Sequence, residues 1–199
     1  MGHSEGRDRD LKKASGITDS NTDAHDLWHI EPVPSMLLDS PLDFLLSSHS
    51  RIRQASALLM MVAAGEFDRQ VVEELVEFLN GPLLDHLDDE EQGFFPLLCS
   101  SCPVEDDIRS LTDRMVEEHV QHKRLCVIIV DILKSLLLGG AISPKGAKEI
   151  RFFAEDLRQH LAFENSVLLP ISRVRLSSES LETLSNKLKE RRHLKSKGG

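Results

Sequence analysis

Apolar residues recur three and four positions apart along most of the chain, the spacing that places them on one face of an α-helix. The pattern predicts four long helices, at residues 40–64, 68–98, 103–138 and 143–169. A shorter amphipathic helix is expected at about 178–192, next to a basic C-terminal tail. No segment shows the alternating pattern of a β-strand, so the fold class is all-α.

Local signals mark where these helices begin, bend and end. Ser40-Pro41 is an N-cap followed by a proline at the first helical position, and Gly65 ends the first helix. Gly81-Pro82 interrupts the second helix, because the proline removes one backbone hydrogen bond. The connections between the long helices are short, which favours antiparallel neighbours. We therefore expect an up-down-up-down four-helix bundle.

The bundle is expected to occupy residues 35–172, between two tails. Residues 1–34 are polar and lack a sustained period, which predicts a mostly disordered N-terminal arm. Trp28, the one tryptophan, is expected to pin the end of that arm to the bundle. Residues 173–199 should form the amphipathic helix and the basic tail.

Composition narrows the class of function. The chain of 199 residues suits one domain, and its net charge of −9 argues against nucleic acid as a partner. It has no apolar run of membrane-spanning length and no secretory signal, so we expect neither a membrane association nor export. The three cysteines are too few for a disulfide framework, which favours the cytoplasm.

Two short segments 74 residues apart are near copies of each other. Residues 83–90 read LLDHLDDE and residues 157–164 read LRQHLAFE, and a proline follows each glutamate six positions later. In both copies the histidine lies four residues before the glutamate, so the two side chains share one helix face. A histidine and a carboxylate on one face make a pair of metal ligands. The residues concerned are His86, Glu90, His160 and Glu164.

The repeat also makes a prediction for the other two helices. If the second helix matches the fourth, the first should match the third. His49 and His119 align at an offset of 70 residues, and each follows an apolar pair located four and three positions upstream. Every long helix therefore contributes one histidine, and two of the helices add a glutamate.

These six residues on apolar helix faces predict a metal centre in the core. Burying a carboxylate without a partner costs on the order of several kcal/mol, so a cation should lie between them. Histidine and carboxylate together suit iron, manganese or zinc, and two shared glutamates would hold two ions close together. A ferritin-like bundle would show Glu-x-x-His instead, and a bis-histidine haem site needs no paired glutamates.

The pattern resembles the hemerythrin-like (HHE cation-binding) domain over about residues 38–172. The matching positions, in order, are His49, His86, Glu90, His119, His160 and Glu164. The resemblance implies two non-haem iron ions, with manganese or zinc as possible substitutes. One ion would bind the histidines of the first two helices and the other ion those of the last two. Both glutamates would bridge the ions, with an oxo or hydroxo group completing the pair.

Two positions depart from the oxygen-carrying members of that family. Those proteins have a fifth histidine four residues after the histidine of the third helix, where this chain has Lys123. They also use an aspartate as the last bridge, five residues after its histidine, where this chain has Glu164 at four. His122 is interpreted as a helix-surface histidine, and its part in the site is left open. The pattern is similar to the four-histidine, two-glutamate variant of bacterial iron–sulfur-repair proteins, although residues 1–34 lack their cysteine.

Three functional hypotheses follow from this resemblance. We expect a protein that binds or senses a diatomic gas, O2 or NO, or that handles iron and redox stress. The first alternative is a di-iron enzyme that reduces NO or peroxide, or an iron donor to damaged clusters. The second is a regulatory module whose interaction with a protein partner depends on metal. No general base and nucleophile stand apart from the ligands, and no nucleotide loop is present.

Other features receive structural interpretations. Cys99-x-x-Cys102 is expected in the loop between the second and third helices without a redox role, and Cys126 in the core. The acidic neighbours of Glu90 are expected in solvent, although one of them could accept the second N–H of a ligand histidine. The basic tail is expected to be a solvated helix end, with docking to an acidic partner as the alternative.

Overall fold

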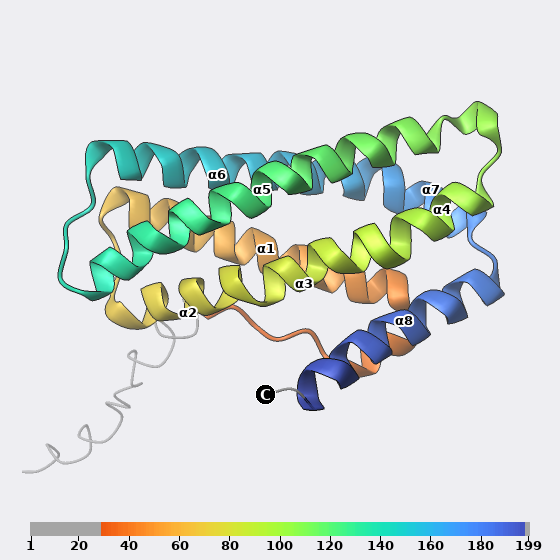
Figure 1. Ribbon diagram of the computed structural model, residues 1–199, viewed down its shortest axis with the longest axis horizontal. Coiled ribbons are helices and arrows are strands. Elements are labelled where there is room, and N and C mark those ends of the chain that lie inside the picture. The colour runs from red at the N-terminus through yellow and green to blue at the C-terminus, as the bar shows by residue number, and fades with distance from the viewer. Residues whose placement is uncertain (1–28, 198–199) are drawn as a thin grey trace, which may run out of the picture.

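Four helical arms lie side by side along the longest axis of the molecule, and each runs antiparallel to the next (Figure 1). The computed structural model describes residues 29–197, and no strand occurs among them. The predicted all-α up-down-up-down bundle is confirmed. Its α-helices are α1 (Pro41–Ala64), α2 (Arg69–Asn80), α3 (Pro82–Asp89), α4 (Phe95–Ser101), α5 (Ile108–Leu137), α6 (Pro144–Phe163), α7 (Leu169–Arg175) and α8 (Ser178–Lys197).

Most helix boundaries follow the local signals, but the second arm ends at Ser101 rather than at residue 98, the fourth ends at Arg175 rather than at residue 169, and the third starts later than expected. α1 begins at Pro41 and ends at Gly65, whose φ of 86° is left-handed. Gly81 separates α2 from α3, as the Gly-Pro pair predicted. The third arm was expected from residue 103, but a short 3-10 turn (Val104–Asp106) comes first. Asp107, with a φ of 48°, then changes the chain direction before α5 starts.

Two π turns interrupt the second and fourth arms, where the periodicity indicated continuous α-helix. They are η3 (Glu90–Phe94) and η5 (Glu164–Leu168), and each is followed by a proline six residues after its glutamate. A proline clashes with the carbonyl four residues earlier and offers it no N–H. Widening that turn to an i to i+5 hydrogen bond relieves the clash, and the N–H of Phe95 bonds to the carbonyl of Glu90. Both glutamates therefore open a π turn.

Apolar side chains fill the bundle in two clusters, one toward each end. The first holds residues such as Ile52, Leu87 and Leu157, and the second holds residues such as Leu45 and Phe94. Fully burying a leucine or phenylalanine contributes about 1.5–3 kcal/mol, so these clusters supply most of the driving force for folding. Along every arm the predicted ligands lie between the two clusters.

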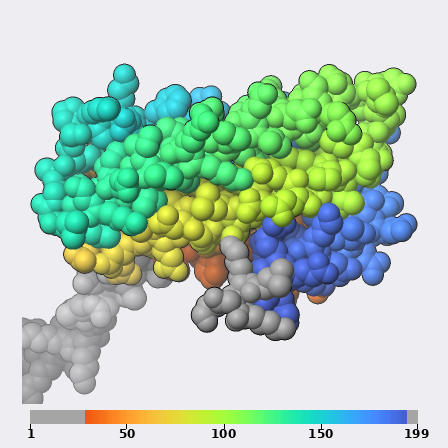
Figure 2. Space-filling model, in the orientation of Figure 1, coloured from red at the N-terminus to blue at the C-terminus, as the bar shows by residue number. Residues whose placement is uncertain are grey.

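The C-terminal helix α8 lies against the bundle, beside the segment that joins α3 to α4 (Figures 1 and 2). The expectation of a solvated basic helix end holds for Lys189, which stays exposed, and is wrong for Arg191 and Arg192, which contact a buried carboxylate. Lys189 pairs with Asp39, and Arg191 and Arg192 pair with Asp89.

Two further expectations concern the N-terminal arm and the membrane. Most of the proposed N-terminal arm and Trp28 lie outside the described residues. Within residues 29–197, none of the helices has the length and apolar character needed to span a membrane.

Candidate metal centre

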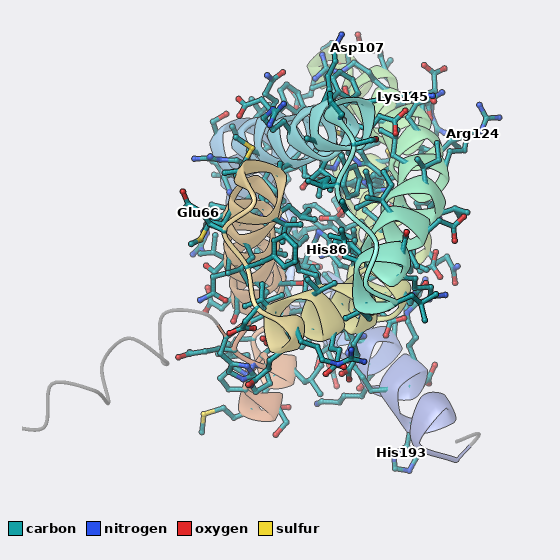
Figure 3. All side chains as sticks on the ribbon, turned by 90° about the vertical axis from the view of Figure 1, so that its left-hand side faces the viewer. Glu66, His86, Asp107, Arg124, Lys145 and His193 are labelled. Atoms are coloured by element: carbon teal, nitrogen blue, oxygen red, sulfur yellow. The ribbon has the colours of Figure 1, made fainter. Side chains whose placement is uncertain are left out.

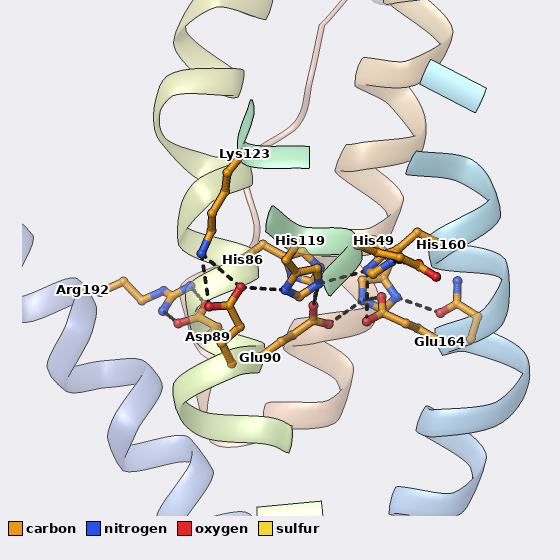
Figure 4. Close-up of polar contacts among 12 residues, drawn as sticks. His49, His86, Asp89, Glu90, His119, Lys123, His160, Glu164 and Arg192 are labelled. Atoms are coloured by element: carbon orange, nitrogen blue, oxygen red, sulfur yellow. Dashed lines mark hydrogen bonds and ion pairs between the residues drawn. The ribbon is translucent and has the colours of Figure 1, made fainter. Parts of the chain in front are cut away.

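All six predicted ligands meet at one level of the bundle (Figure 4). Each α-helical arm supplies one histidine, and each π turn presents its first residue, a glutamate, to the same space. Figure 3 shows His86 inside the bundle, far from labelled surface residues such as Glu66. The six side chains are buried, with at most 3% of any residue exposed.

The ligand atoms fall into two groups of four that share both glutamates. One group is His49, His86, Glu90 and Glu164, and the other is Glu90, His119, His160 and Glu164. Within each group, one ligand atom from every residue lies within 4.8 Å of all the others. Because both groups contain both carboxylates, the arrangement suits two ions side by side with the glutamates between them.

Hydrogen bonds outside the centre orient three of the four imidazole rings. Nδ1 of His119 lies 2.9 Å from Glu91, and Nδ1 of His160 lies 2.8 Å from Glu118. Nδ1 of His49 lies 2.8 Å from the side-chain oxygen of Asn165. An imidazole that donates Nδ1–H outward presents the lone pair of Nε2 inward, which is the geometry of a metal-binding histidine.

These outer contacts obey the internal repeat and cross between its halves. Glu91 and Asn165 occupy equivalent positions, one residue after each glutamate ligand, and each holds the histidine from the first arm of the opposite half. The counterpart of Glu118 is Ser48, and Nδ1 of His86 has no hydrogen-bond partner. Two carboxylates therefore support the His119–His160 pair, whereas the His49–His86 pair has one neutral amide.

Nε2 of His119 lies 3.0 Å from Nε2 of His160. When both rings donate Nδ1–H outward, these two nitrogens face each other with lone pairs, which requires a proton or a metal ion between them. Burial acts to lower the pKa of His160, but the hydrogen bond to Glu118 and the nearby negative charge of Glu164 outweigh it and raise that pKa to about 10. Without metal, a proton on His160 fills this role.

The two glutamates are in unequal electrostatic positions. Burial, together with the charge of Glu164, raises the pKa of Glu90 well above its ordinary value. Burial also opposes ionisation of Glu164, yet the nearby positive charge of His160 and the other surrounding imidazoles lower the pKa of Glu164. Of the two carboxylates, Glu90 therefore holds a proton more strongly than Glu164 does.

Several polar atoms at the centre have no hydrogen-bond partner. They are Oε2 of Glu90, both side-chain oxygens of Glu164, and both ring nitrogens of His86. The nearest imidazole nitrogens lie 3.4–3.5 Å from the glutamate oxygens, beyond a good hydrogen bond. Among residues 29–193, whose side chains the structure describes, no lysine or arginine pairs with either glutamate. A buried carboxylate left in this way is costly, and cations bound between the histidines and glutamates would remove the cost.

Lys123, at the position of the fifth histidine of the oxygen carriers, does not point its charge at the glutamates of the centre. Its Nζ donates to Glu91 at 3.0 Å and to Asp88 at 3.1 Å. Lys123 therefore braces the carboxylate that orients His119. The expectation that one acidic neighbour of Glu90 could accept from a ligand histidine is met by Glu91. Asp89, in contrast, is fully buried rather than solvated.

His122 is not on the helix surface, as was expected, but buried with 1% exposed. Its Nε2 lies 3.1 Å from Asp156, and its ring stands perpendicular to that of His160, with centroids 4.9 Å apart. Burial and the nearby imidazoles lower the pKa of His122 to about 3. Its nitrogens belong to neither group of ligand atoms. His122 packs behind the centre, against the rings of His119, His160 and Phe153.

The cysteines lie away from the ligands. Cys99 is in α4 rather than in a loop, and its thiol is 3.2 Å from the hydroxyl of Thr112. Cys102 follows at the end of the helix, and Cys126 is buried in the core, as predicted. All three are free thiols. No cysteine contributes to either group of ligand atoms.

Sequence reasoning identified all six central residues and missed most of the outer contacts. Glu91, Glu118 and Asn165 each adjoin a ligand in sequence, which was an available signal. Each of them, however, contacts a histidine on a different helix from its own neighbour, and that pairing depends on how the helices pack.

Comparison with known proteins agrees with this geometry. Residues 40–172 match the family model described as the hemerythrin HHE cation-binding domain, which covers about two thirds of the chain. No curated protein and no solved structure matches the chain significantly. The matched segment contains all six central residues and both π turns. The chain belongs to the hemerythrin HHE cation-binding domain family.

Proposed function

We propose that the protein binds two iron ions at adjoining positions and uses them to bind a diatomic gas, O2 or NO, reversibly. The observation that carries the proposal is the set of unpartnered atoms on Glu90, Glu164 and His86. These atoms are buried, they are ligand types that iron accepts, and no lysine or arginine whose side chain the structure describes pairs with them. Reversible binding requires a metal position that the protein leaves open.

The ligand assignment follows the two groups of atoms. His49 and His86 would hold one ion, His119 and His160 the other, and Glu90 and Glu164 would serve both. Four protein ligands are fewer than the six that iron commonly takes, so each ion would keep positions for a small ligand. The mixture of imidazole and carboxylate, with no thiolate, favours iron over a structural zinc site.

Bound iron would supply the redox change and the open position, and the chain supplies the surroundings. Phe95 stacks on His119, with ring centroids 5.7 Å apart, and apolar clusters lie above and below the centre. Such walls exclude water and suit a small, weakly polar ligand. Glu91, Glu118 and Asn165 keep the imidazole rings in place when the ligand enters or leaves.

The two metal positions should differ in strength. A carboxylate that accepts Nδ1–H makes an imidazole a better donor than a neutral amide does. The His119–His160 position has two such carboxylates, and the His49–His86 position has none. We infer that the His119–His160 position fills first, and that the His49–His86 position is the weaker and more open one.

Metal analysis and visible spectroscopy test the proposal. Protein reconstituted with ferrous iron without air should hold about two irons per chain and show a charge-transfer band on exposure to O2 or NO, which reverses when the gas is removed. The variant His86→Ala/His160→Ala should lose both irons. His122→Ala is the matched control, because it removes a buried histidine outside both groups, and it should keep both irons.

Three outcomes would overturn parts of this proposal. Fewer than about two irons in the parent protein would refute the paired site. Full metal content in the double variant would refute the ligand assignment. Consumption of NO or peroxide with an electron donor, in place of a reversible spectral change, would show that the protein is an enzyme.

A further inference from the structure

Helix α8 follows the family-matched segment and contacts the π turn that presents Glu90. The matched segment ends at residue 172, and α8 spans Ser178–Lys197. Its neighbours are the start of α1, the short turn before it, and η3. In Figure 2, α8 lies directly on the surface formed by the α3–α4 segment. The helix is therefore packed against the backbone around one glutamate of the metal centre.

A buried aspartate next to Glu90 makes the main contact with α8. Asp89 has no exposed surface and directly precedes Glu90 in the chain, and its carboxylate faces Arg192 (Figure 4). Arg192 donates from Nη1 to Oδ1 at 2.9 Å and from Nη2 to Oδ2. Arg191 places Nε 2.7 Å from Oδ1 as an additional ion pair. Removing the arginines would leave an uncompensated buried charge one residue from Glu90.

The backbone and side chain of the π turn are also bonded to α8. Pro96 has no N–H, so the carbonyl of Gln92 lacks the donor that an α-helix would provide. Nζ of Lys187 donates to that carbonyl at 3.0 Å. Nη1 of Arg191 donates to the side-chain oxygen of Gln92, also at 3.0 Å. Helix α8 thus stabilises the wider turn that Pro96 imposes.

Close packing accompanies these polar contacts. Gly93 lies in the π turn, and a Cβ atom added to it would stand 3.1 Å from Cδ1 of Leu184. The absence of a side chain at this position lets α8 approach the turn. Leu184 is itself fully buried. The sequence of the turn is therefore adapted to α8 as well as to the metal centre.

The second half of the repeat shows that metal ligation does not require these features. At an offset of 74 residues, the counterpart of Asp89 is Phe163 and that of Gly93 is Val167. Phe163 packs under the guanidinium of Arg114 at 4.3 Å. The other glutamate thus opens an equivalent π turn without a buried aspartate or a glycine.

We propose that Asp89 is a positioning residue. Through Asp89, α8 holds Glu90 where it would bridge the two ions, and the docking of α8 is coupled to metal occupancy. The inference rests on the proposed metal site, but not on iron or on a gas ligand. Because coupling between two sites is reciprocal, α8 should slow metal loss, and bound metal should protect α8 from opening. The stability of the docked α8 then depends on whether the centre holds metal.

A matched pair of variants separates this coupling from general docking. Arg191→Ala/Arg192→Ala removes the contacts to Asp89, together with the hydrogen bond of Arg191 to Gln92 and the packing of Arg192 on Phe44. Lys189→Ala removes a contact of the same helix to Asp39, before α1, and leaves the π turn untouched. Arg192→Lys keeps a positive charge but cannot reproduce both hydrogen bonds, so it should show an intermediate effect.

The experiment uses full-length protein loaded with Co(II), and it measures two quantities. The first is the rate of metal transfer to a coloured chelator. This rate should rise about tenfold or more in Arg191→Ala/Arg192→Ala, the size of effect expected when a group that supports a metal ligand is lost. In Lys189→Ala the rate should stay within about twofold of that of the parent protein. The second is amide hydrogen exchange across residues 178–192, with and without metal. Metal should slow this exchange in the parent protein and in Lys189→Ala but not in the double variant.

Distinct results would overturn the inference or the metal site itself. Equal exchange across α8 with and without metal in the parent protein, or parent-like metal loss in the double variant, would refute coupling through Asp89. If the double variant does not fold, Arg192→Lys carries the same test. A parent protein that fails to bind Co(II) or iron would instead refute the proposed metal centre.

Discussion

Replacing Glu118 by alanine should weaken the tighter of two metal-binding steps and leave the fold intact. The carboxylate accepts a hydrogen bond from Nδ1 of His160 at 2.8 Å. This carboxylate keeps Nε2 of His160 aimed at the centre and makes the ring a stronger donor, and the substitution removes both effects. Because Glu118 is partly exposed and belongs to neither apolar cluster, the bundle itself should persist.

The magnitude follows from the exposure of this contact. Removal of an outer partner of a metal-binding histidine typically costs a factor of about 10–100 in affinity, or about 1.4–2.7 kcal/mol. The side chain of Glu118 is 38% exposed, so water can take part of its place. We therefore expect about a tenfold loss. Glu118→Gln keeps an acceptor oxygen, as Asn165 does for His49, and should recover most of the affinity.

A competition titration without air measures this effect. Ferrous iron or Co(II) is divided between the protein and a chelator of known affinity, and the two binding steps are fitted separately. Glu117→Ala is the control, because its side chain adjoins Glu118 on the same helix but is exposed. Parent-like affinity in Glu118→Ala, or an equal loss in Glu117→Ala, would refute the role assigned to this hydrogen bond.

Three further predictions concern protons, thiols and stability. Metal binding near pH 7 should release the proton that His160 holds in the metal-free centre, since the pKa of His160 is about 10; calorimetry in buffers of different ionisation enthalpy would detect its release. Burial raises the pKa of Cys126 to about 12, so a thiol reagent at pH 8 should modify Cys99 and Cys102 in the native protein and Cys126 only on unfolding. Leu79→Ala, in the cluster away from the ligands, should lower the free energy of unfolding by about 2–5 kcal/mol in denaturant titrations without changing metal stoichiometry; a metal deficit there would contradict the separation of core and site.

The sequence alone determined the bundle and its six central residues. The three- and four-residue spacing of apolar positions fixes which face of each helix is buried, and His86 and Glu90 share a face because they are four residues apart. The repeat then located His49 and His119 without any knowledge of their contacts. These inferences succeed because helix geometry is a local property of the backbone.

Tertiary structure decided the features that depend on how one helix meets another. In the sequence, the prolines after Glu90 and Glu164 serve only to align the repeat, and the structure shows that each follows a π turn where periodicity indicated continuous α-helix. The burial of His122, the contact of Glu118 with His160, and the pairing of Asp89 with α8 all join separate helices. Periodicity gives the direction of a side chain on its own helix. The rotation and offset of neighbouring helices, set by the packing of the whole core, determine what that side chain contacts.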